Sequence, residues 1–161
     1  MIEELARLAA PLGELLKERR QKIAVADGAT GGLISAALLT VPGATRFYRG
    51  GGVVYSLKGR DILLNLPAAD LVGMTSVTEA YALLQAKAIR DNFGAHWGVA
   101  ESGSAGPAHP RGVAAGRSCI AVAGPGVALV RSVDTDRDDR IGNMEAFTIA
   151  ALGLLKEALD A

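Results

Sequence analysis

The stretch Ile23-Ala-Val-Ala-Asp-Gly-Ala-Thr-Gly-Gly-Leu-Ile-Ser-Ala-Ala-Leu-Leu39 decides the fold of this chain. It begins with an apolar run typical of a strand, passes through a loop with Gly28, Gly31 and Gly32, and continues as an Ala-rich segment typical of a helix. Such a turn can bind an anion, because its N–H groups approach a ligand closely and the helix N-terminus is partially positive. The spacing matches neither a phosphate-loop nor a dinucleotide fingerprint, so a tight turn without a ligand is the alternative. The hydroxyl of Thr30 could cap the helix.

The composition limits the class of protein. The 161 residues are enough for one domain with a proper core, and with 50% hydrophobic and 21% charged residues the chain is globular. Aromatic residues are only 4%, so we expect a core of Ala, Val, Leu and Ile. Lys plus Arg and Asp plus Glu number 17 each, and this balance gives no support for general nucleic-acid binding. The single cysteine, Cys119, excludes an internal disulfide and is expected to be a buried strand thiol.

No targeting or membrane segment is evident. The N-terminus, Met-Ile-Glu-Glu-Leu-Ala, is acidic and amphipathic, which is unlike a signal peptide, and no apolar run is long enough to span a membrane. We therefore expect a cytoplasmic protein with no membrane partner.

Hydrophobic periodicity predicts helices that alternate with strands. We expect helices over residues 2–20, 31–39, 58–65, 75–93 and 144–159, and strands over residues 22–26, 53–56, 97–100, 118–123 and 128–133. Gly124-Pro-Gly126 is typical of a hairpin between the last two strands, and the segment 108–116 is expected to be a flexible loop. This order predicts an α/β fold with a mostly parallel sheet, covered on both faces, plus an antiparallel hairpin.

The helix expected over residues 75–93 has a start signal and an apolar face. Its cap is expected to be Thr75 or Ser76, and the side chains expected to face inward are Leu83, Leu84, Ala88 and Ile89.

A second glycine loop, Glu101-Ser-Gly-Ser-Ala-Gly-Pro107, follows the strand over residues 97–100. In open α/β sheets, ligands bind beyond the carboxyl ends of the strands. Both glycine loops follow strands directly, so we expect them to lie side by side in one cleft.

Four segments, in order along almost the whole chain, carry a resemblance. Ala26-Asp-Gly-Ala-Thr-Gly-Gly32 is similar to an Ala-Glu-Ser-Cys-Thr-Gly-Gly segment, and Gly50-Gly-Gly-Val-Val-Tyr-Ser56 with Arg60 is similar to a Tyr-Ser-x-x-x-Lys element. Gly98-Val-Ala-Glu-Ser-Gly-Ser-Ala-Gly-Pro107 is similar to a Thr-Gly-Ile-Ala-Gly-Pro loop, and Asp139-Arg140 precedes the last helix. Together they resemble the CinA C-terminal domain family, which includes amidohydrolases that convert nicotinamide mononucleotide to nicotinic acid mononucleotide and ammonia.

The resemblance implies a three-layer α/β/α sandwich with no metal or organic cofactor, formed by a single domain over residues 1–161. It also implies a small-molecule mononucleotide as ligand and, with the larger N-terminal domain absent, a stand-alone member. The chain departs from the family at the chemistry, since the nucleophilic serine corresponds to Gly28 and the activating lysine to Arg60. Glycine has no side chain to attack an amide, and arginine stays protonated, which argues against classical covalent deamidation.

The candidate site residues follow from these matches. Tyr55 and Thr30 are the candidate catalytic residues, with packing and helix capping as their respective alternatives. The candidate substrate-binding residues are Asp27, Gly28, Gly31, Gly32, Arg60, Ser102, Gly103, Ser104 and Arg140. For the serines the alternative is an ordinary turn, and for Arg140 it is a surface position.

The sequence leaves three functions open. One is an amidohydrolase of the nicotinamide-nucleotide type, working weakly through another nucleophile. Another is a catalytically silent nucleotide-binding or sensing protein of the same fold. An enzyme acting on a different small amide or phosphorylated substrate is a third possibility, and the Ala-rich, aromatic-poor composition suggests a homo-oligomer.

Overall fold

The computed structural model describes residues 1–108 and 112–161, so residues 109–111 of the loop predicted over 108–116 lie outside the described residues. Within that part of the chain, five strands form one sheet in the order β2-β1-β3-β4-β5. The strands are β1 (Ile23–Asp27), β2 (Tyr48–Val53), β3 (Trp97–Ser104), β4 (Arg117–Gly124) and β5 (Val127–Asp134). β1 pairs in parallel with β2 and β3, whereas β4 pairs antiparallel with both β3 and β5. The sheet is therefore mixed.

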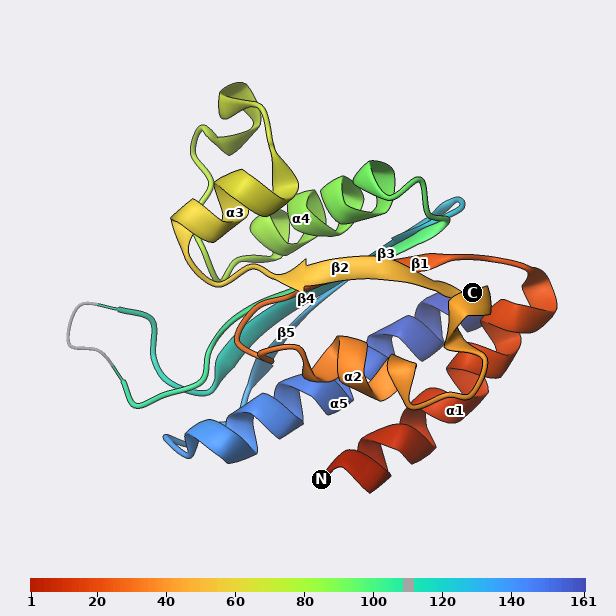
Figure 1. Ribbon diagram of the computed structural model, residues 1–161. Helices are drawn as coiled ribbons and strands as arrows, with labels where there is room; N and C mark the ends of the chain where they lie inside the picture. The colour runs from red at the N-terminus through yellow and green to blue at the C-terminus, as the bar shows by residue number, and fades with distance from the viewer. Residues whose placement is uncertain (109–111) are drawn as a thin grey trace.

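Helices cover both faces of this sheet, as Figure 1 shows. α1 (Ile2–Arg19), α2 (Leu33–Leu39) and α5 (Arg140–Asp160) lie on one face, and α3 (Leu57–Leu64) and α4 (Glu79–Asn92) lie on the other. Two short 3-10 helices, η1 (Ala44–Arg46) and η2 (Ala68–Leu71), occur in the connections. The predicted α/β/α sandwich is confirmed.

The alternation of side chains along β1 separates two cores of different composition. Ile23 and Val25 face α1, α2 and α5, where they join the large side chains of Phe47 and Trp97. Ala24 and Ala26 point to the opposite face and lie in a cluster made largely of alanines beneath α4. The small residues let α4 approach the sheet closely, as expected for a chain poor in aromatic residues.

Several predicted boundaries are wrong for reasons of pairing. The strand predicted over residues 53–56 lies earlier, in β2, because the Gly50-Gly-Gly52 segment itself pairs with β1. β3 continues to Ser104 through part of the predicted glycine loop, because antiparallel pairing with β4 extends that far. The predicted hairpin between β4 and β5 is confirmed.

The predicted helix starts also differ. The cap of α4 is Thr78, whose Oγ1 accepts a hydrogen bond from the backbone N of Tyr81, and not Thr75 or Ser76. α5 begins four residues before the predicted Met144, because the side chain of Asp139 caps it by accepting from Gly142 N.

The inward face of α4 is rotated from the predicted one. Leu83, Leu84 and Ala88 are only partly buried, although Leu83 and Ala88 still pack against the alanine-rich core, whereas Ile89 is buried as expected. The buried face consists instead of Tyr81, Ala82, Gln85, Ala86 and Ile89. Two side chains with polar groups, Tyr81 and Gln85, thus belong to the buried face although they were not predicted there.

None of the described helices is both long and apolar enough to cross a membrane.

Gly51 in β2 supplies a test of the close pairing with β1. A Cβ at this position would overlap the carbonyl oxygen of Val25, so we expect Gly51→Ala to lower the free energy of unfolding by about 2 kcal/mol or more. Gly153 is the matched control, because it is exposed in α5 with no atom near its Cβ position. Gly153→Ala should raise stability by about 0.5–1 kcal/mol, since alanine favours the helix. Urea denaturation measures both, and equal effects would contradict the pairing.

Candidate functional site

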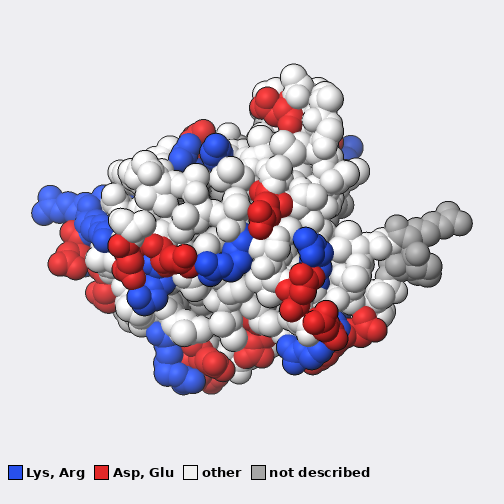
Figure 2. Space-filling view, turned by 180° about the vertical axis from the view of Figure 1, so that it is seen from behind, with Lys and Arg blue, Asp and Glu red and all other residues white. Residues whose placement is uncertain are grey.

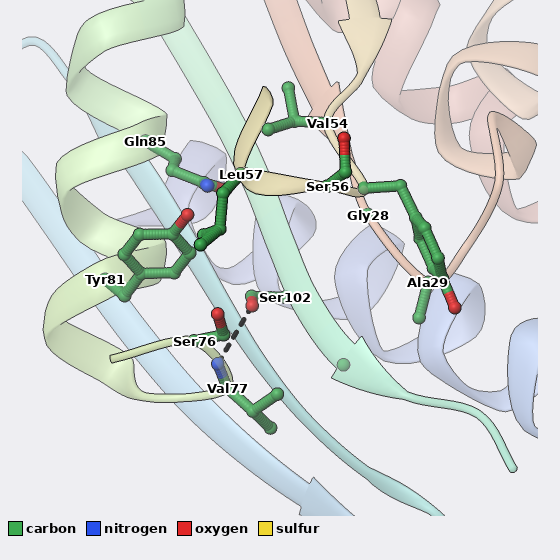
Figure 3. A pocket seen from close by; sticks show the side chains of 12 residues that line it. Gly28, Ala29, Val54, Ser56, Leu57, Ser76, Val77, Tyr81, Gln85 and Ser102 are labelled. Carbon is green, nitrogen blue, oxygen red and sulfur yellow. Dashed lines mark hydrogen bonds between the residues drawn. The ribbon is translucent and has the colours of Figure 1, made fainter. Parts of the chain in front are cut away.

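Two adjoining cavities lie where the first glycine loop meets β3 and the segments around α3 and α4. The first, which we name the neutral cavity, has a volume of about 230 Å³, and no charged side chain lines it among the described residues. Its lining residues are Gly28, Ala29, Val54, Tyr55, Ser56, Leu57, Ser76, Val77, Tyr81, Gln85, Ser102 and Gly103 (Figure 3). The predicted meeting of the two glycine loops in one cleft is confirmed, since Gly28 and Gly103 share this wall.

The second cavity, which we name the arginine cavity, has a volume of about 290 Å³. It is lined by Tyr55, Val77, Gly103, Ser104, Ala105, Gly106, Pro107, Gly112, Val113 and Arg140. Arg140 is the charged member of this set, and Tyr55, Val77 and Gly103 belong to both cavities. The two cavities therefore form neighbouring parts of one cleft, with a cation in one part.

A buried carboxylate joins the two glycine loops. Glu101 of β3 is fully buried, and its Oε1 accepts hydrogen bonds from the backbone N of Gly28 at 3.0 Å and of Thr30 at 2.9 Å. Its Oε2 accepts from the hydroxyl of Ser118 on β4 at 2.7 Å. We name this set of contacts the Glu101 bridge. It fixes the backbone of the β1–α2 turn against β3.

Burial raises the pKa of the Glu101 carboxyl above its ordinary value of 4.5. The hydrogen bonds from Thr30, Ser118 and Gly28 favour the charged form and oppose this shift, but loss of hydration is the larger effect. The folded protein therefore binds the Glu101 proton more tightly than the unfolded chain does.

Asp27, predicted to bind substrate, is the fully buried last residue of β1, and its carboxylate lies at the start of α2. Its carboxylate accepts from Ile34 N at 2.9 Å and from Ser35 N at 3.2 Å, and also from the Ser35 hydroxyl. These bonds satisfy free N–H groups in the first turn of the helix. Asp27 is not among the residues that line either cavity.

Thr30 does not cap α2, because the N-cap position is Gly32, which has no side chain. The Thr30 hydroxyl instead lies 2.6 Å from Asp27 Oδ1 and 2.9 Å from Glu101 Oε1, and the residue is 0% exposed. With a single proton, the hydroxyl can donate to only one of these carboxyl groups at a time. It joins the two buried acids and does not line either cavity.

Gly28 lines the neutral cavity at the position that resembles a catalytic serine, and its surroundings are closed. A Cβ built there would overlap the carbonyl oxygen of Glu101 and would lie 3.3 Å from Glu101 Oε1. A serine at position 28 therefore requires the β1–α2 turn to move away from β3. The backbone of Glu101 thus occupies the space that a side chain at position 28 would need.

The hydroxyls that do line the neutral cavity have no base beside them. Ser56 Oγ accepts from Gly59 N as the cap of α3, and Ser102 Oγ accepts from Val77 N at 2.9 Å. Tyr55, which is 65% exposed, accepts from Arg140 at 3.1 Å. In residues 1–108 and 112–161, no carboxylate or imidazole lies within hydrogen-bond distance of these lining hydroxyls.

Val77 adds a strained backbone position between the two cavities. Its φ is 57°, in the left-handed region that a β-branched residue rarely adopts. The hydrogen bond from its N–H to Ser102 holds this conformation, and the residue lines both cavities. Strain of this kind commonly occurs at binding sites.

Tyr81 and Gln85 are site residues that the sequence analysis missed. They lie one helical turn apart on α4, and Figure 3 shows both side chains directed into the neutral cavity. The available signal was a glutamine at the spacing of the buried face set by Ala82, Ala86 and Ile89. A polar residue on an apolar stripe is a candidate for a polar role within the core.

The other predicted binding residues divide between the arginine cavity and the turn. Arg140 donates to the carbonyl oxygen of Gly106 and to Tyr55, and Ser104 lines the same cavity. Gly31 and Gly32 have φ of 67° and 102° in the turn before α2 and line neither cavity.

Arg60 also lies outside both linings and pairs with Asp61 at 2.9 Å. Hydrogen bonding to Tyr81, with that to Asp61, raises the pKa of its guanidinium further. Arg60 is thus a permanent cation that contacts Tyr81 but does not line the neutral cavity.

Away from the cleft, four basic side chains line a third cavity, and these are Lys17, Arg20, Lys22 and Arg46. On the face seen in Figure 2, acidic and basic groups are interspersed and do not gather by sign. Among the described residues, no group of three or more His, Cys, Asp and Glu side chains is arranged to hold a metal ion.

Comparison with known sequences gives consistent matches. The family model of the CinA C-terminal domain matches residues 5–159. A CinA-like protein of Desulforapulum autotrophicum is 32% identical over 150 residues, which cover 92% of this chain and 35% of that protein. A CinA-like protein of Frankia casuarinae is 33% identical over 145 residues, covering 90% of this chain and 33% of that protein. The chain thus spans about a third of the length of these relatives.

Comparison with solved structures supports the same fold. The competence damage-inducible protein A of Klebsiella pneumoniae superposes with a TM-score of 0.87 at 27% identity, covering 97% of each chain. A competence or damage-inducible protein of Enterobacter asburiae gives a TM-score of 0.87 at 29% identity, covering 96% of this chain and 98% of that one.

The Glu101 bridge predicts different results for two substitutions. Glu101→Ala leaves two buried N–H groups and the Ser118 hydroxyl without an acceptor, and we expect it to lower the free energy of unfolding by about 3 kcal/mol or more. Glu101→Gln keeps an acceptor for both N–H groups and can donate to Ser118, so near neutral pH it should cost much less. Equal losses in chemical denaturation would contradict the bridge.

The same residue predicts a pH dependence. The stability contributed by protonated Glu101 is fully present below its unfolded pKa and is lost as the pH rises through the raised folded pKa. Glu101→Gln does not titrate there. We expect the unfolding free energy of the wild type, measured relative to Glu101→Gln, to decrease as the pH rises from about 4.5. An increase over that window would mean that the folded pKa is lowered.

Proposed function

Since this chain belongs to the CinA C-terminal domain family, we propose that its cleft binds a mononucleotide with an uncharged base, of the nicotinamide mononucleotide type. The observation that carries the proposal is the division of the cleft into a cavity with no charged lining residue and an adjoining one that contains Arg140. The base occupies the neutral cavity, and the phosphate lies near the guanidinium of Arg140.

The dimensions of the cleft support this arrangement. Each cavity alone is at or below the small end of the range of about 300–1,000 Å³ that is usual for ligand pockets, and the two together fall within it. Tyr55 belongs to both linings, and its hydroxyl accepts a hydrogen bond from Arg140. A ligand with two chemically different ends fits better than a ligand of uniform polarity.

The chemistry of the cleft favours binding over turnover. Amide hydrolysis through a side-chain nucleophile requires a hydroxyl or thiol beside a base. The Ser and Thr hydroxyls that contact the carboxylate of Glu101 belong to Thr30 and Ser118, and both residues are fully buried. The hydroxyls that line the neutral cavity lack a base among the described residues. We therefore propose a nucleotide-binding or sensing role with little or no deamidation.

A slow amidohydrolase is the second candidate, and Ser56 is the residue that favours it. Ser56 and Gly28 both line the neutral cavity (Figure 3), so a hydroxyl lies in the same cavity as the position that resembles the serine. Its Oγ accepts from Gly59 N at 3.0 Å and still has its own proton to lose. Catalysis from this position would have to proceed without a general base in contact.

The binding proposal predicts an effect of Arg140. We expect nicotinamide mononucleotide to bind the purified wild type in isothermal titration calorimetry, and Arg140→Gln to weaken binding by roughly tenfold to a hundredfold through loss of charge-assisted hydrogen bonds. Arg131→Gln, on β5 and paired with Glu157, is the control and should bind as the wild type does. Equal affinity in all three proteins would refute the assigned phosphate position.

Turnover separates the two candidate functions. We expect the wild type to release no ammonia from nicotinamide mononucleotide above the uncatalysed rate, as followed together with nicotinic acid mononucleotide. If release is detected, Ser56→Gly should abolish it while costing only a few tenths of a kcal/mol in the cap of α3. Activity that survives Ser56→Gly would point to water or to another side chain.

A further inference from the structure

One buried polar atom in the neutral cavity has no partner. Gln85 is 2% exposed, and its Oε1 is buried without a hydrogen bond to any atom of the described residues. Among these residues, it is the one buried side-chain oxygen or nitrogen left unpaired. The side chain points from α4 toward the cavity, near Leu57 and Tyr81 (Figure 3).

This arrangement costs stability and has no structural compensation. An unpaired buried amide loses its hydration and gains no hydrogen bond in return. The neighbours of Gln85 on the buried face of α4 are Tyr81, Ala82, Ala86 and Ile89, and none of them is hydrogen-bonded to its Oε1. An apolar residue of similar length would fill the same space without this cost, so the amide is explained by a group that is supplied from outside the chain.

We infer that Gln85 recognises an uncharged amide edge of the ligand, in a reciprocal pair of hydrogen bonds at the floor of the neutral cavity. The inference rests on the proposed function, since it concerns the base-binding part of the same cleft. A primary amide carries both a donor and an acceptor, and it pairs with the terminal amide of Gln85 in either orientation of that group. The hydroxyl of Tyr81, one turn away on α4, lines the same wall.

The lining of the cavity extends the inference to discrimination. A ligand with a carboxylate in place of the amide would bring a negative charge into a cavity with no charged lining residue among those described. It would also lose the donor that satisfies Gln85 Oε1. Both effects oppose the acid, because a buried charge without a partner and a buried acceptor without a donor are each unfavourable. The guanidinium of Arg60, which contacts Tyr81, lies outside the lining and is already paired with Asp61. Gln85 is therefore a specificity residue for amide over acid.

The test compares amide and acid ligands on three proteins. The ligands are nicotinamide mononucleotide, nicotinic acid mononucleotide, and the fragments nicotinamide and nicotinate, with affinities measured by calorimetry and NMR titration. The wild type should prefer each amide over its acid by roughly tenfold or more. Gln85→Met should reduce this ratio to about one. It should also raise the melting temperature of the free protein, since the unpaired amide is removed.

Gln21→Met is the matched control. Gln21 lies far from the cavity, and its Oε1 accepts from Trp97 Nε1 at 2.8 Å. Removing this acceptor should lower the melting temperature and leave the amide preference unchanged. The comparison therefore shows whether the effects of Gln85→Met arise from the lack of a protein partner, because the amide of Gln21 has such a partner and the Oε1 of Gln85 has none.

The outcomes distinguish the inference from the proposed function. If the mononucleotide binds but Gln85→Met keeps the amide preference, or if Gln85→Met lowers the melting temperature, the inference is overturned and the function stands. If nicotinamide binds in a manner that depends on Gln85 while neither mononucleotide binds, the inference stands and the mononucleotide function falls. If none of the four ligands binds the wild type, both are wrong.

Discussion

The cleft depends on a single buried carboxylate. Glu101 lies on β3, yet it accepts hydrogen bonds from the backbone of the β1–α2 turn and from Ser118 on β4. A fully buried acid is tolerated only when its oxygens are satisfied, and here the turn supplies most of the donors. The β1–α2 turn is held in its shape by Glu101 and by Asp27, whose carboxylate lies at the start of α2. Sheet, turn and helix are therefore positioned by two neighbouring carboxyl groups joined through Thr30.

The same interaction explains why the chemistry implied by the family resemblance is missing. The closure of the turn onto Glu101 leaves no space for a side chain at position 28, and it holds the Thr30 hydroxyl where a ligand cannot reach it. The turn has no catalytic side chain, but it forms a rigid wall of the neutral cavity, because its N–H groups are fixed and Gly28 and Ala29 line that cavity. A rigid, largely preformed wall lowers the entropic cost of binding a small ligand.

Local patterns were sufficient to predict most elements but not their partners. The strand and helix of residues 23–39 and the β4–β5 hairpin follow from periodicity and glycine placement, which act within a few residues. The Gly50-Gly-Gly52 strand was missed because glycine disfavours strands, and only close contact with β1 accounts for it. Local patterns predict a loop at Glu101 and a helix cap at Thr30, because the contacts that define these residues join positions about 70 residues apart in sequence. Of the candidate site, Tyr55, Ser102 and Arg140 lie in the cleft, whereas Asp27 and Arg60 line neither cavity.

The position of Gln85 shows how the thin alanine layer connects the fold to the cleft. Alanines on β1, β3 and β4 bring α4 close to the sheet, and they leave little apolar volume for its inward side chains to fill. Ala82, Ala86 and Ile89 meet this layer, whereas Tyr81 and Gln85 lie on the part of the helix that borders the cavity. Small residues hold α4 close to the sheet, and the helix carries polar groups where it borders the cavity. These groups form an uncharged, hydrogen-bonding floor opposite the Gly28 turn. Arg140 in the adjoining cavity provides the charge that this floor lacks.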